Sequence, residues 1–261
     1  MNLRRVLNVG LPPAAFGVVF VVAWEAVVQG FDLKPYFLPA PSAIWNALID
    51  NAELVRNASF ASGANALVGL LAGTLLGITA SFLLMRFNIL NELVSPLAIA
   101  LNAVPIIVLV AVFQNMFAST SEIPRRLMVM LIVFFIVLVN VAKGLRQVHP
   151  THLELMRSYA ASPVAILTKT RIPNALPYLF TALKIAAPTA VITAFVSEYF
   201  GGRQNGLGYF IPSNFANSKN AVAWAYVIGA CLLGLTFYLV SVILESIIKQ
   251  RRGAAPGGET T

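Results

Sequence analysis

Long apolar stretches, separated by short polar ones, divide this chain into segments that are each long enough to cross a lipid bilayer. A membrane-spanning helix needs about 20 predominantly apolar residues, because each residue adds about 1.5 Å to its length. We predict six such helices, at residues 11–30, 63–85, 93–117, 127–142, 176–200 and 221–248. The pattern therefore predicts an all-α polytopic membrane protein.

The composition supports this prediction. Hydrophobic residues make up 58% of the chain and charged residues 11%, whereas about a quarter of the residues in soluble domains are charged. The first apolar stretch follows the basic segment MNLRRVLNVG, a combination that also opens signal peptides. Its length, its Trp24 and Glu25, and the lack of a small-residue cleavage site after it favour a retained helix.

Lysine and arginine residues indicate how the helices are oriented. If segment 1–10 is cytoplasmic, the inner loops hold most of the basic residues, as the positive-inside rule requires. We therefore expect a six-helix domain at 11–248 with both termini in the cytoplasm and a flexible tail at 249–261. The net charge of +8 then reflects membrane topology. A nucleic-acid partner is not predicted, because no basic stripe is interleaved with aromatic residues.

The longest inner loop, at 143–175, is unusually polar and rich in proline for a membrane protein. Proline removes a backbone donor and biases the preceding residue away from helix. We expect the loop to be divided into short pieces at four positions: Pro150, Pro163, Pro173 and Pro177.

Two short helices are expected within this loop. The first, at 151–160, would have Thr151 as its N-cap and Glu154 completing a capping box. The second, at 162–170, would have Ser162 as its N-cap and Pro163 in its first turn. The small residues at 160–162 would let another surface approach the backbone closely, so the loop is suited to binding a partner.

Small and charged residues inside the spans are further candidates. Gly69, Gly73 and Gly77 share one face of the second span and permit close helix packing, either within one chain or between two copies. Lys184 in the fifth span would reach the surface, make a structural contact, or face a translocation path and attract an anion. Glu198, near the outer end of the same span, would shape the outer mouth or be solvated at the interface.

Two external features complete the expected layout. Glu25 lies beside Trp24 near the outer end of the first span and is expected to anchor it at the interface. An amphipathic helix is expected at 42–56, in or near the membrane surface.

The sequence gives little support for catalysis. The single cysteine, Cys231, lies in an apolar run, so no disulfide framework or thiolate metal site is predicted. His149 and His152 have Glu154 as their nearest further ligand, and Pro150 breaks the helix they would need, so we predict no metal site. The chain also lacks the G-x-x-x-x-G-K-[ST] phosphate loop, so it is not expected to bind a nucleotide in that way.

The polar loop resembles the EAA motif of the membrane subunits of ATP-binding cassette (ABC) importers. Glu154 heads the match, Ala160 stands at the motif's glycine, and Ile172 and Pro173 fall on its Leu-Pro pair. The stretches MRSYAAS and IPNALPYLF resemble the fuller form of the motif.

Other stretches match in order along nearly the whole chain: FLPAPSAIWNAL, LNAVPIIVL, NVAKGLRQVHP, ALKIA and SEYFGGRQNGLGYFI. Each is similar to its counterpart in the nitrate, sulfonate and taurine branch of these importers.

This resemblance implies the type I importer permease fold, with six transmembrane helices and a cytoplasmic coupling helix. The residues implied for coupling to the ATPase are Glu154, Arg157, Ala160, Ala161, Ser162, Pro163, Ile172 and Pro173. The candidates for lining the translocation path are Lys184, Glu198, Asn102 and Pro105. Alanine at 160 is costly if the backbone there needs a positive φ angle.

The resemblance also implies a set of partners in the bacterial inner membrane. These are two copies of a cytoplasmic ATP-binding subunit, a second permease chain, and an extracytoplasmic binding protein that delivers the solute. A homodimer is expected, because two ATPases need two coupling loops and each chain has one. The solute would be of the sulfonate, nitrate or taurine type, or a vitamin precursor such as a pyrimidine or riboflavin.

An autonomous secondary carrier or channel is the alternative function. Such a protein is expected to have ionisable residues near the middle of the membrane and internal repeats. The sequence shows neither feature clearly.

Overall fold

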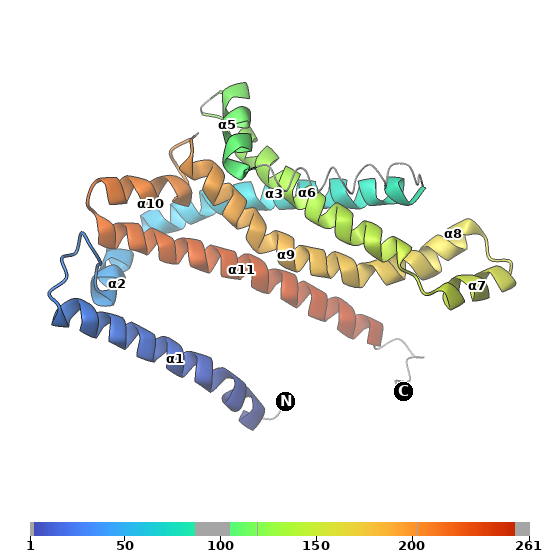
Figure 1. Cartoon of the computed structure of the whole chain (residues 1–261), viewed down its shortest axis with the longest axis horizontal. Helices are drawn as coiled ribbons and strands as arrows, with labels where there is room; N and C mark the ends of the chain where they lie inside the picture. Colours follow the sequence, from blue (N-terminus) through green and yellow to red (C-terminus); the bar gives the residue numbers. More distant parts are fainter. Residues whose placement is uncertain (1–2, 87–104, 119, 202, 254–261) are drawn as a thin grey trace.

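The computed structural model describes residues 3–86, 105–118, 120–201 and 203–253, and all regular elements in these ranges are helices. Figure 1 shows them along the chain. They are α1 (Leu3–Gly30), α2 (Pro41–Asp50), α3 (Ala52–Arg86), α5 (Ile106–Met116), α6 (Ile123–Arg146), α7 (Pro150–Ser158), α8 (Pro163–Ile166), the π-helical turn η1 (Leu167–Arg171), α9 (Ile172–Tyr199), α10 (Leu207–Ala216) and α11 (Asn220–Gly253).

Within the described residues, five stretches are long and apolar enough to cross a membrane. They are Leu11–Gly30, Ala52–Arg86, Ile123–Arg146, Pro163–Tyr199 and Asn220–Ile248. These five overlap five of the six predicted spans. The remaining predicted span, at 93–117, lies partly outside the described residues, and its described part contains the 11-residue α5.

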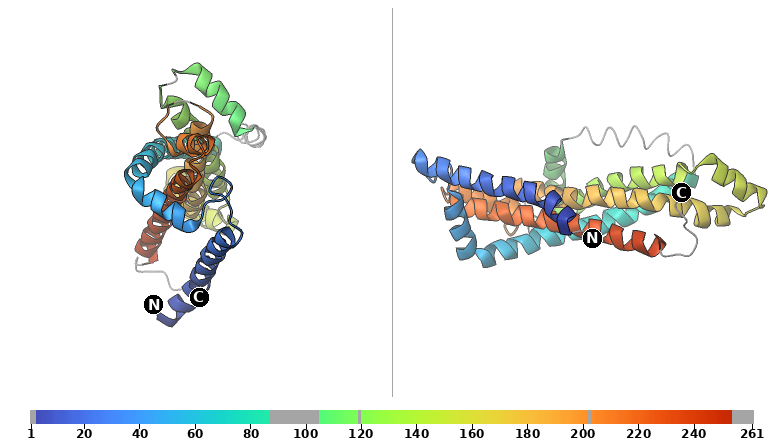
Figure 2. Two further views of the ribbon diagram at one scale, coloured as in Figure 1. Left: turned by 90° about the vertical axis from the view of Figure 1, so that its left-hand side faces the viewer. Right: turned by 90° about the horizontal axis from the view of Figure 1, so that it is seen from below.

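Helices α3, α6, α9 and α11 run roughly along the long axis of the molecule (Figures 1 and 2). Helices α7 and α8 project beyond the bundle at one end, while α2 and α10 lie at the opposite end. The two ends of the bundle therefore differ in structure, and each carries one of the polar regions described below.

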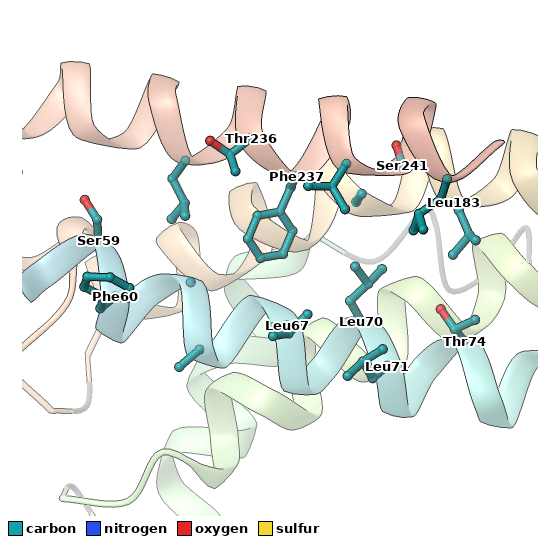
Figure 3. Close-up of a pocket in the computed structure, with 16 residues that line it drawn as sticks. Ser59, Phe60, Leu67, Leu70, Leu71, Thr74, Leu183, Thr236, Phe237 and Ser241 are labelled. Atoms are coloured by element: carbon teal, nitrogen blue, oxygen red, sulfur yellow. The ribbon is translucent and has the colours of Figure 1, made fainter. Parts of the chain in front are cut away.

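Helix α1 stands apart from the bundle and is joined to it mainly through α2. Glu25 of α1 connects the two helices, because it accepts hydrogen bonds from the Ser42 backbone N (3.0 Å) and Oγ (2.7 Å) of α2. Between α3 and α11 lies an apolar groove of about 590 Å³, lined by residues such as Leu67, Leu71 and Phe237 (Figure 3). Helices α1 and α11 are therefore packed less tightly than the centre.

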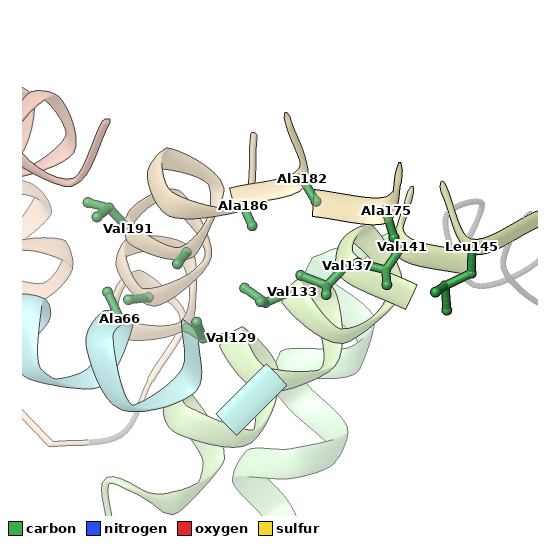
Figure 4. Packing of buried hydrophobic residues seen from close by; sticks show 12 residues of the cluster. Ala66, Val129, Val133, Val137, Val141, Leu145, Ala175, Ala182, Ala186 and Val191 are labelled. Carbon is green, nitrogen blue, oxygen red and sulfur yellow. The ribbon is translucent and has the colours of Figure 1, made fainter. Parts of the chain in front are cut away.

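The centre of the bundle consists of α6 packed between α3 and α9 (Figure 4). Buried side chains recur every fourth residue or so along the facing helices, which places them on one stripe of each. On α6 the stripe is valine-rich and on α9 it is alanine-rich. Its members are Val129, Val133, Val137 and Val141 on α6, and Ala175, Ala182, Ala186, Ala190 and Ala194 on α9.

Three glycines on α3 form a seam with α6. A Cβ atom added at Gly73 would lie 2.6 Å from the Met130 backbone oxygen and 2.8 Å from Val133 Cβ, and Gly69 and Gly77 are similarly tight. Glycine is therefore required here because the two backbones approach closely. Of the two alternatives for this glycine stripe, the structure shows packing within one chain.

The expected amphipathic helix at 42–56 is wrong in its extent. Helix α2 ends at Asp50, and α3 begins at Ala52 rather than at residue 63. The Asn51 side chain donates a hydrogen bond to the Ala47 carbonyl oxygen (2.8 Å) and closes the last turn of α2. This local bond favours a turn between the two helices over continuation of the first.

The expectation that Pro173 and Pro177 divide the polar loop is also wrong. Both lie in α9, and the chain is helical from Pro163 to Tyr199. The π-helical turn η1 explains how, because the Ile172 N–H bonds to the Leu167 carbonyl oxygen, one residue further back than in an α-helix. The wider turn shifts the hydrogen-bond register just before Pro173, which has no N–H to donate.

The glycine seam gives a stability prediction. Gly73→Ala is expected to lower the free energy of unfolding by about 1–3 kcal/mol, because its Cβ would meet backbone atoms of α6 that cannot move alone. The control is Gly234→Ala on α11, where a new Cβ has no heavy atom within 4 Å. This variant is expected to be neutral or to stabilise by up to about 1 kcal/mol. Thermal unfolding in detergent measures both, and equal shifts would contradict the seam.

Candidate functional site

The α7–α8 segment projects from one end of the bundle and has no buried residue in either helix. Three large apolar side chains are nevertheless exposed on it: Leu155 (52%), Tyr159 (77%) and Val164 (68%). A polar projection that displays apolar side chains has the features of a protein-docking surface. We call this segment, residues 150–166, the coupling segment.

The caps of its two helices differ from each other. Ser162 Oγ accepts a hydrogen bond from the Ala165 backbone N (3.2 Å), which confirms Ser162 as the N-cap of α8, with Pro163 in the first turn. The predicted capping box at Thr151 and Glu154 is wrong, because the N-cap of α7 is His149 and it makes no side-chain cap. Pro150 is well suited to the first helical position, so α7 begins earlier than predicted.

The turn between α7 and α8 requires a left-handed residue, and Ala160 supplies it with φ of 51°. The Ala160 N–H bonds to the Arg157 oxygen (2.9 Å), and the Ala161 N–H bonds to the Met156 oxygen (3.0 Å). This pair of bonds is a Schellman motif, in which glycine is the usual residue at the position of Ala160. The glycine of the EAA motif is thus replaced by alanine at a position with a positive φ angle.

The base of the coupling segment is held against α6. Asn174 Nδ2 donates to the Gly144 oxygen (2.7 Å), and Arg171 Nη1 donates to the Leu145 oxygen (3.1 Å). The predicted coupling residues fall into two groups around this base. Glu154, Arg157, Ala160, Ser162 and Pro163 are exposed on the segment, whereas Ala161, Ile172 and Pro173 are half-buried.

A buried polar cluster occupies the opposite end of the bundle. Glu198, at the end of α9, is 2% exposed, so solvation at the interface is excluded. Its Oε2 accepts hydrogen bonds from Ser62 Oγ of α3 (2.6 Å) and from the Gly208 backbone N of α10 (3.1 Å). Ser62 Oγ also accepts a hydrogen bond from the Leu207 backbone N (2.9 Å). One carboxylate and one hydroxyl thus join three helices.

The second half of this cluster is centred on Arg125, which is fully buried at the start of α6. Its Nη1 donates to Glu122 Oε2 (2.9 Å) and to Asn205 Oδ1 (2.8 Å), and its Nη2 donates to the Arg203 oxygen. Asn65 of α3 also donates to Glu122 Oε2 (2.9 Å). Segment 203–206 is therefore tied to α6 by side-chain hydrogen bonds.

The environment of Glu122 favours its charged form. Partial burial acts to raise the pKa of this carboxyl, but hydrogen bonds from Asn205 and Asn65 and the Arg125 guanidinium outweigh it. The pKa of Glu122 is therefore held below its ordinary value of 4.5.

The other predicted path residues are placed as follows. Lys184 Nζ lies 2.8 Å from Glu245 Oε2, so it makes a structural ion pair between α9 and α11. Pro105 is exposed just before α5, and Asn102 lies outside the described residues. The geometry therefore gives Lys184 a pairing role, and Glu198 remains the predicted path residue with the most buried partners.

Sequence reasoning missed most of the polar cluster. Ser62 and Asn65 are three residues apart and thus share a helix face, which is a usable signal in an apolar span. Arg125 is fully buried, although the positive-inside count treats a basic residue between two spans as a loop residue. Its partner Asn205 lies 80 residues away along the chain, and spacing alone gives no indication of this contact.

Comparison with known proteins identifies the family of the chain that contains these two regions. Residues 69–253 match the family described as "Binding-protein-dependent transport system inner membrane component". The chain belongs to this family. It is thus the permease subunit of an ABC importer, a multi-pass membrane protein with the all-α type I fold that the motifs predicted. Membership implies an ATPase partner and a substrate-binding protein.

Individual relatives agree with this assignment. The chain is 30% identical to the formylaminopyrimidine transport permease protein ThiX of Halalkalibacterium halodurans, over 91% of this chain and 94% of that protein. It is 29% identical to a probable ABC transporter permease protein of Haemophilus influenzae, over 87% and 92%. It is 27% identical to the bicarbonate transport system permease protein CmpB of Synechocystis, over 77% and 75%. These matches favour an importer subunit over an autonomous carrier.

The turn of the coupling segment gives a second stability prediction. Ala160→Gly is expected to raise the free energy of unfolding by up to about 1 kcal/mol, because glycine adopts a positive φ without steric cost. Ala160→Val is expected to lower it, since a branched side chain is disfavoured at this φ. Thermal unfolding distinguishes the two, and a destabilising glycine would contradict the left-handed turn.

The lowered pKa of Glu122 predicts a pH dependence. A carboxyl with a depressed folded-state pKa stabilises the fold above its ordinary pKa, and this contribution is lost as pH falls through the folded-state pKa. Glu122→Gln is therefore expected to be less stable than wild type at pH 6–7, with the difference shrinking below about pH 4.5. Unfolding midpoints across this range measure it. A gap that stays constant with pH would contradict an ionised Glu122 in the cluster.

Proposed function

We propose that this chain forms a homodimer that moves a small solute across the bacterial inner membrane by alternating access, driven by two copies of a cytoplasmic ATPase. One coupling segment of each chain docks onto one ATPase subunit. Residues 143–175 form the complete coupling loop, and both termini lie in the cytoplasm. ATP is bound by the partner, and this chain supplies the path.

The observation that carries this proposal is the exposed apolar surface of the coupling segment. Leu155, Tyr159 and Val164 are exposed on a segment that projects away from the bundle. A surface of this kind becomes favourable when a groove on a partner covers it. The helical continuity from Pro163 to Tyr199 then carries movement of the docked segment directly into the membrane.

The solute we propose is a heteroaromatic vitamin precursor of the pyrimidine type. The support is the similarity to the formylaminopyrimidine permease, which extends over nearly the full length of both chains. A sulfonate, nitrate or bicarbonate type of anion is the competing class. The matched extracytoplasmic binding protein distinguishes the two, because its affinity for a pyrimidine or for an anion is directly measurable.

Partner binding tests the function. Tyr159→Glu and Val164→Glu are each expected to reduce the amount of ATPase subunit that co-purifies with the tagged chain by about tenfold or more, because a charge would be buried in the docked surface. The matched control is Asn217→Glu, which places the same charge at an exposed position at the opposite end of the bundle.

Three outcomes are informative. Loss of the ATPase from both coupling variants, with retention in the control, supports the proposal. Equal retention in all three contradicts the docking surface. A chain that purifies without an ATPase and transports without ATP contradicts the proposed function and restores the autonomous carrier.

A further inference from the structure

We propose that Glu198 and Ser62 form a latch that holds the outer end of the bundle closed, and that movement of α9 releases it during each transport cycle. This inference rests on the proposed function. The latch consists of the two side chains together with the backbone N–H groups of Leu207 and Gly208, which they bind. Glu198 and Ser62 are thus positioning residues for transport.

The latch and the coupling segment lie at the two ends of one continuous helical rod. The chain is helical from Pro163, in the coupling segment, to Tyr199, next to Glu198. The 37 residues of this rod, at about 1.5 Å each, give it a length of roughly 55 Å along its axis. Figure 1 shows α8 at one end of the bundle and the end of α9 beside α10 at the other. A displacement at the docked end therefore moves the Glu198 end.

The latch depends on a single side chain from the rod. Glu198 Oε2 receives two hydrogen bonds, one from α3 through Ser62 and one from α10 through Gly208. The Ser62 hydroxyl connects them, because it donates to Glu198 and accepts from the Leu207 N–H. Movement of Glu198 by more than the tolerance of a hydrogen bond breaks this arrangement as a unit.

Close packing around Glu198 allows the latch only two states, engaged and released. A Cβ atom added at Gly206 would lie 2.1 Å from Glu198 Oε2, and one added at Gly208 would lie 2.2 Å from the Phe195 oxygen. The backbone of α10 thus rests directly on the last turn of α9. A contact packed this closely is either formed or lost, because intermediate positions of the α9 end would clash with the α10 backbone.

The far side of segment 203–206 is held independently of the rod. Arg125 of α6 binds Asn205 Oδ1 (2.8 Å) and the Arg203 oxygen, and neither bond involves α9. When α9 moves, segment 203–206 stays with α6, so the break occurs at Glu198. Glu198 Oε1 and Arg125 Nε are buried without a hydrogen-bond partner among the described residues.

Cysteine accessibility tests the latch in the purified complex of this chain with its co-purifying ATPase, in lipid nanodiscs. Cys231, the only cysteine, is replaced by serine, and Leu207→Cys serves as the reporter, because Leu207 is buried beneath the latch. The rate of labelling with a fluorescent maleimide is measured without nucleotide and with ATP plus vanadate. The latch variants are Glu198→Ala and Ser62→Ala. Glu198→Gln is the conservative variant, whose amide oxygen still accepts both bonds.

The matched control is Glu245→Gln, which alters another buried carboxylate that contacts α9, at the Lys184 ion pair. With the latch intact, labelling is expected to be slow without nucleotide and to rise about tenfold with ATP and vanadate, as local opening exposes the reporter. Both alanine variants label fast in both conditions. Glu198→Gln and Glu245→Gln keep the slow rate without nucleotide.

The outcomes separate this inference from the proposed function. Slow labelling in the alanine variants, or fast labelling in Glu245→Gln as well, overturns the latch. An intact complex that hydrolyses ATP without any change in reporter labelling overturns its release during the cycle. If no ATPase co-purifies, the proposed function fails and the release step fails with it, while the nucleotide-free rates still decide whether the latch closes the outer end.

Discussion

The close approach of α3 and α6 at Gly69, Gly73 and Gly77 determines how the rest of the bundle is built. In a membrane, helices gain little from the hydrophobic effect against one another, so association depends on tight packing. The glycine seam lets α6 lie directly against α3, and the alanine-rich face of α9 packs on the other side of α6. These small-residue surfaces let the three helices pack closely.

This packing explains why the polar groups gather at the two ends. Buried polar side chains are costly in lipid unless they are paired, and the apolar stripes along α6 and α9 offer no partners. At one end, Glu198 and Arg125 bind side chains and backbone groups of α3, α10 and segment 203–206. At the other end, the coupling segment exposes Tyr159 and Val164. Helix α9 links the two.

Five of the predicted spans overlap helices of the structure, and the start of α8 was predicted, because both leave local signals. Apolar stretches give the helices, and Ser162 followed by Pro163 marks the start of α8. Features that depend on contacts distant in sequence could not be predicted in this way. The Ser62–Glu198 hydrogen bond joins residues 136 positions apart. The π-helical turn before Pro173 lets the helix continue through a proline, although a proline usually indicates a helix end. The turn at Ala160 could be predicted only in part. The motif indicated a position that normally holds glycine, and the structure adds the positive φ angle.

The central claim is that α8, η1 and α9, from Pro163 to Tyr199, move as one rigid unit. Pulsed electron paramagnetic resonance between spin labels at Val164→Cys and Ile192→Cys, both exposed positions on the rod, tests it in a Cys231→Ser background. Labelled chains are diluted with unlabelled ones, so that only distances within one chain are measured. The account predicts a single narrow distance that is the same without nucleotide and with ATP plus vanadate. A shift of about one helical turn, roughly 5 Å, or a broad distribution in either state would show that the helix bends between the two labels and would contradict the account.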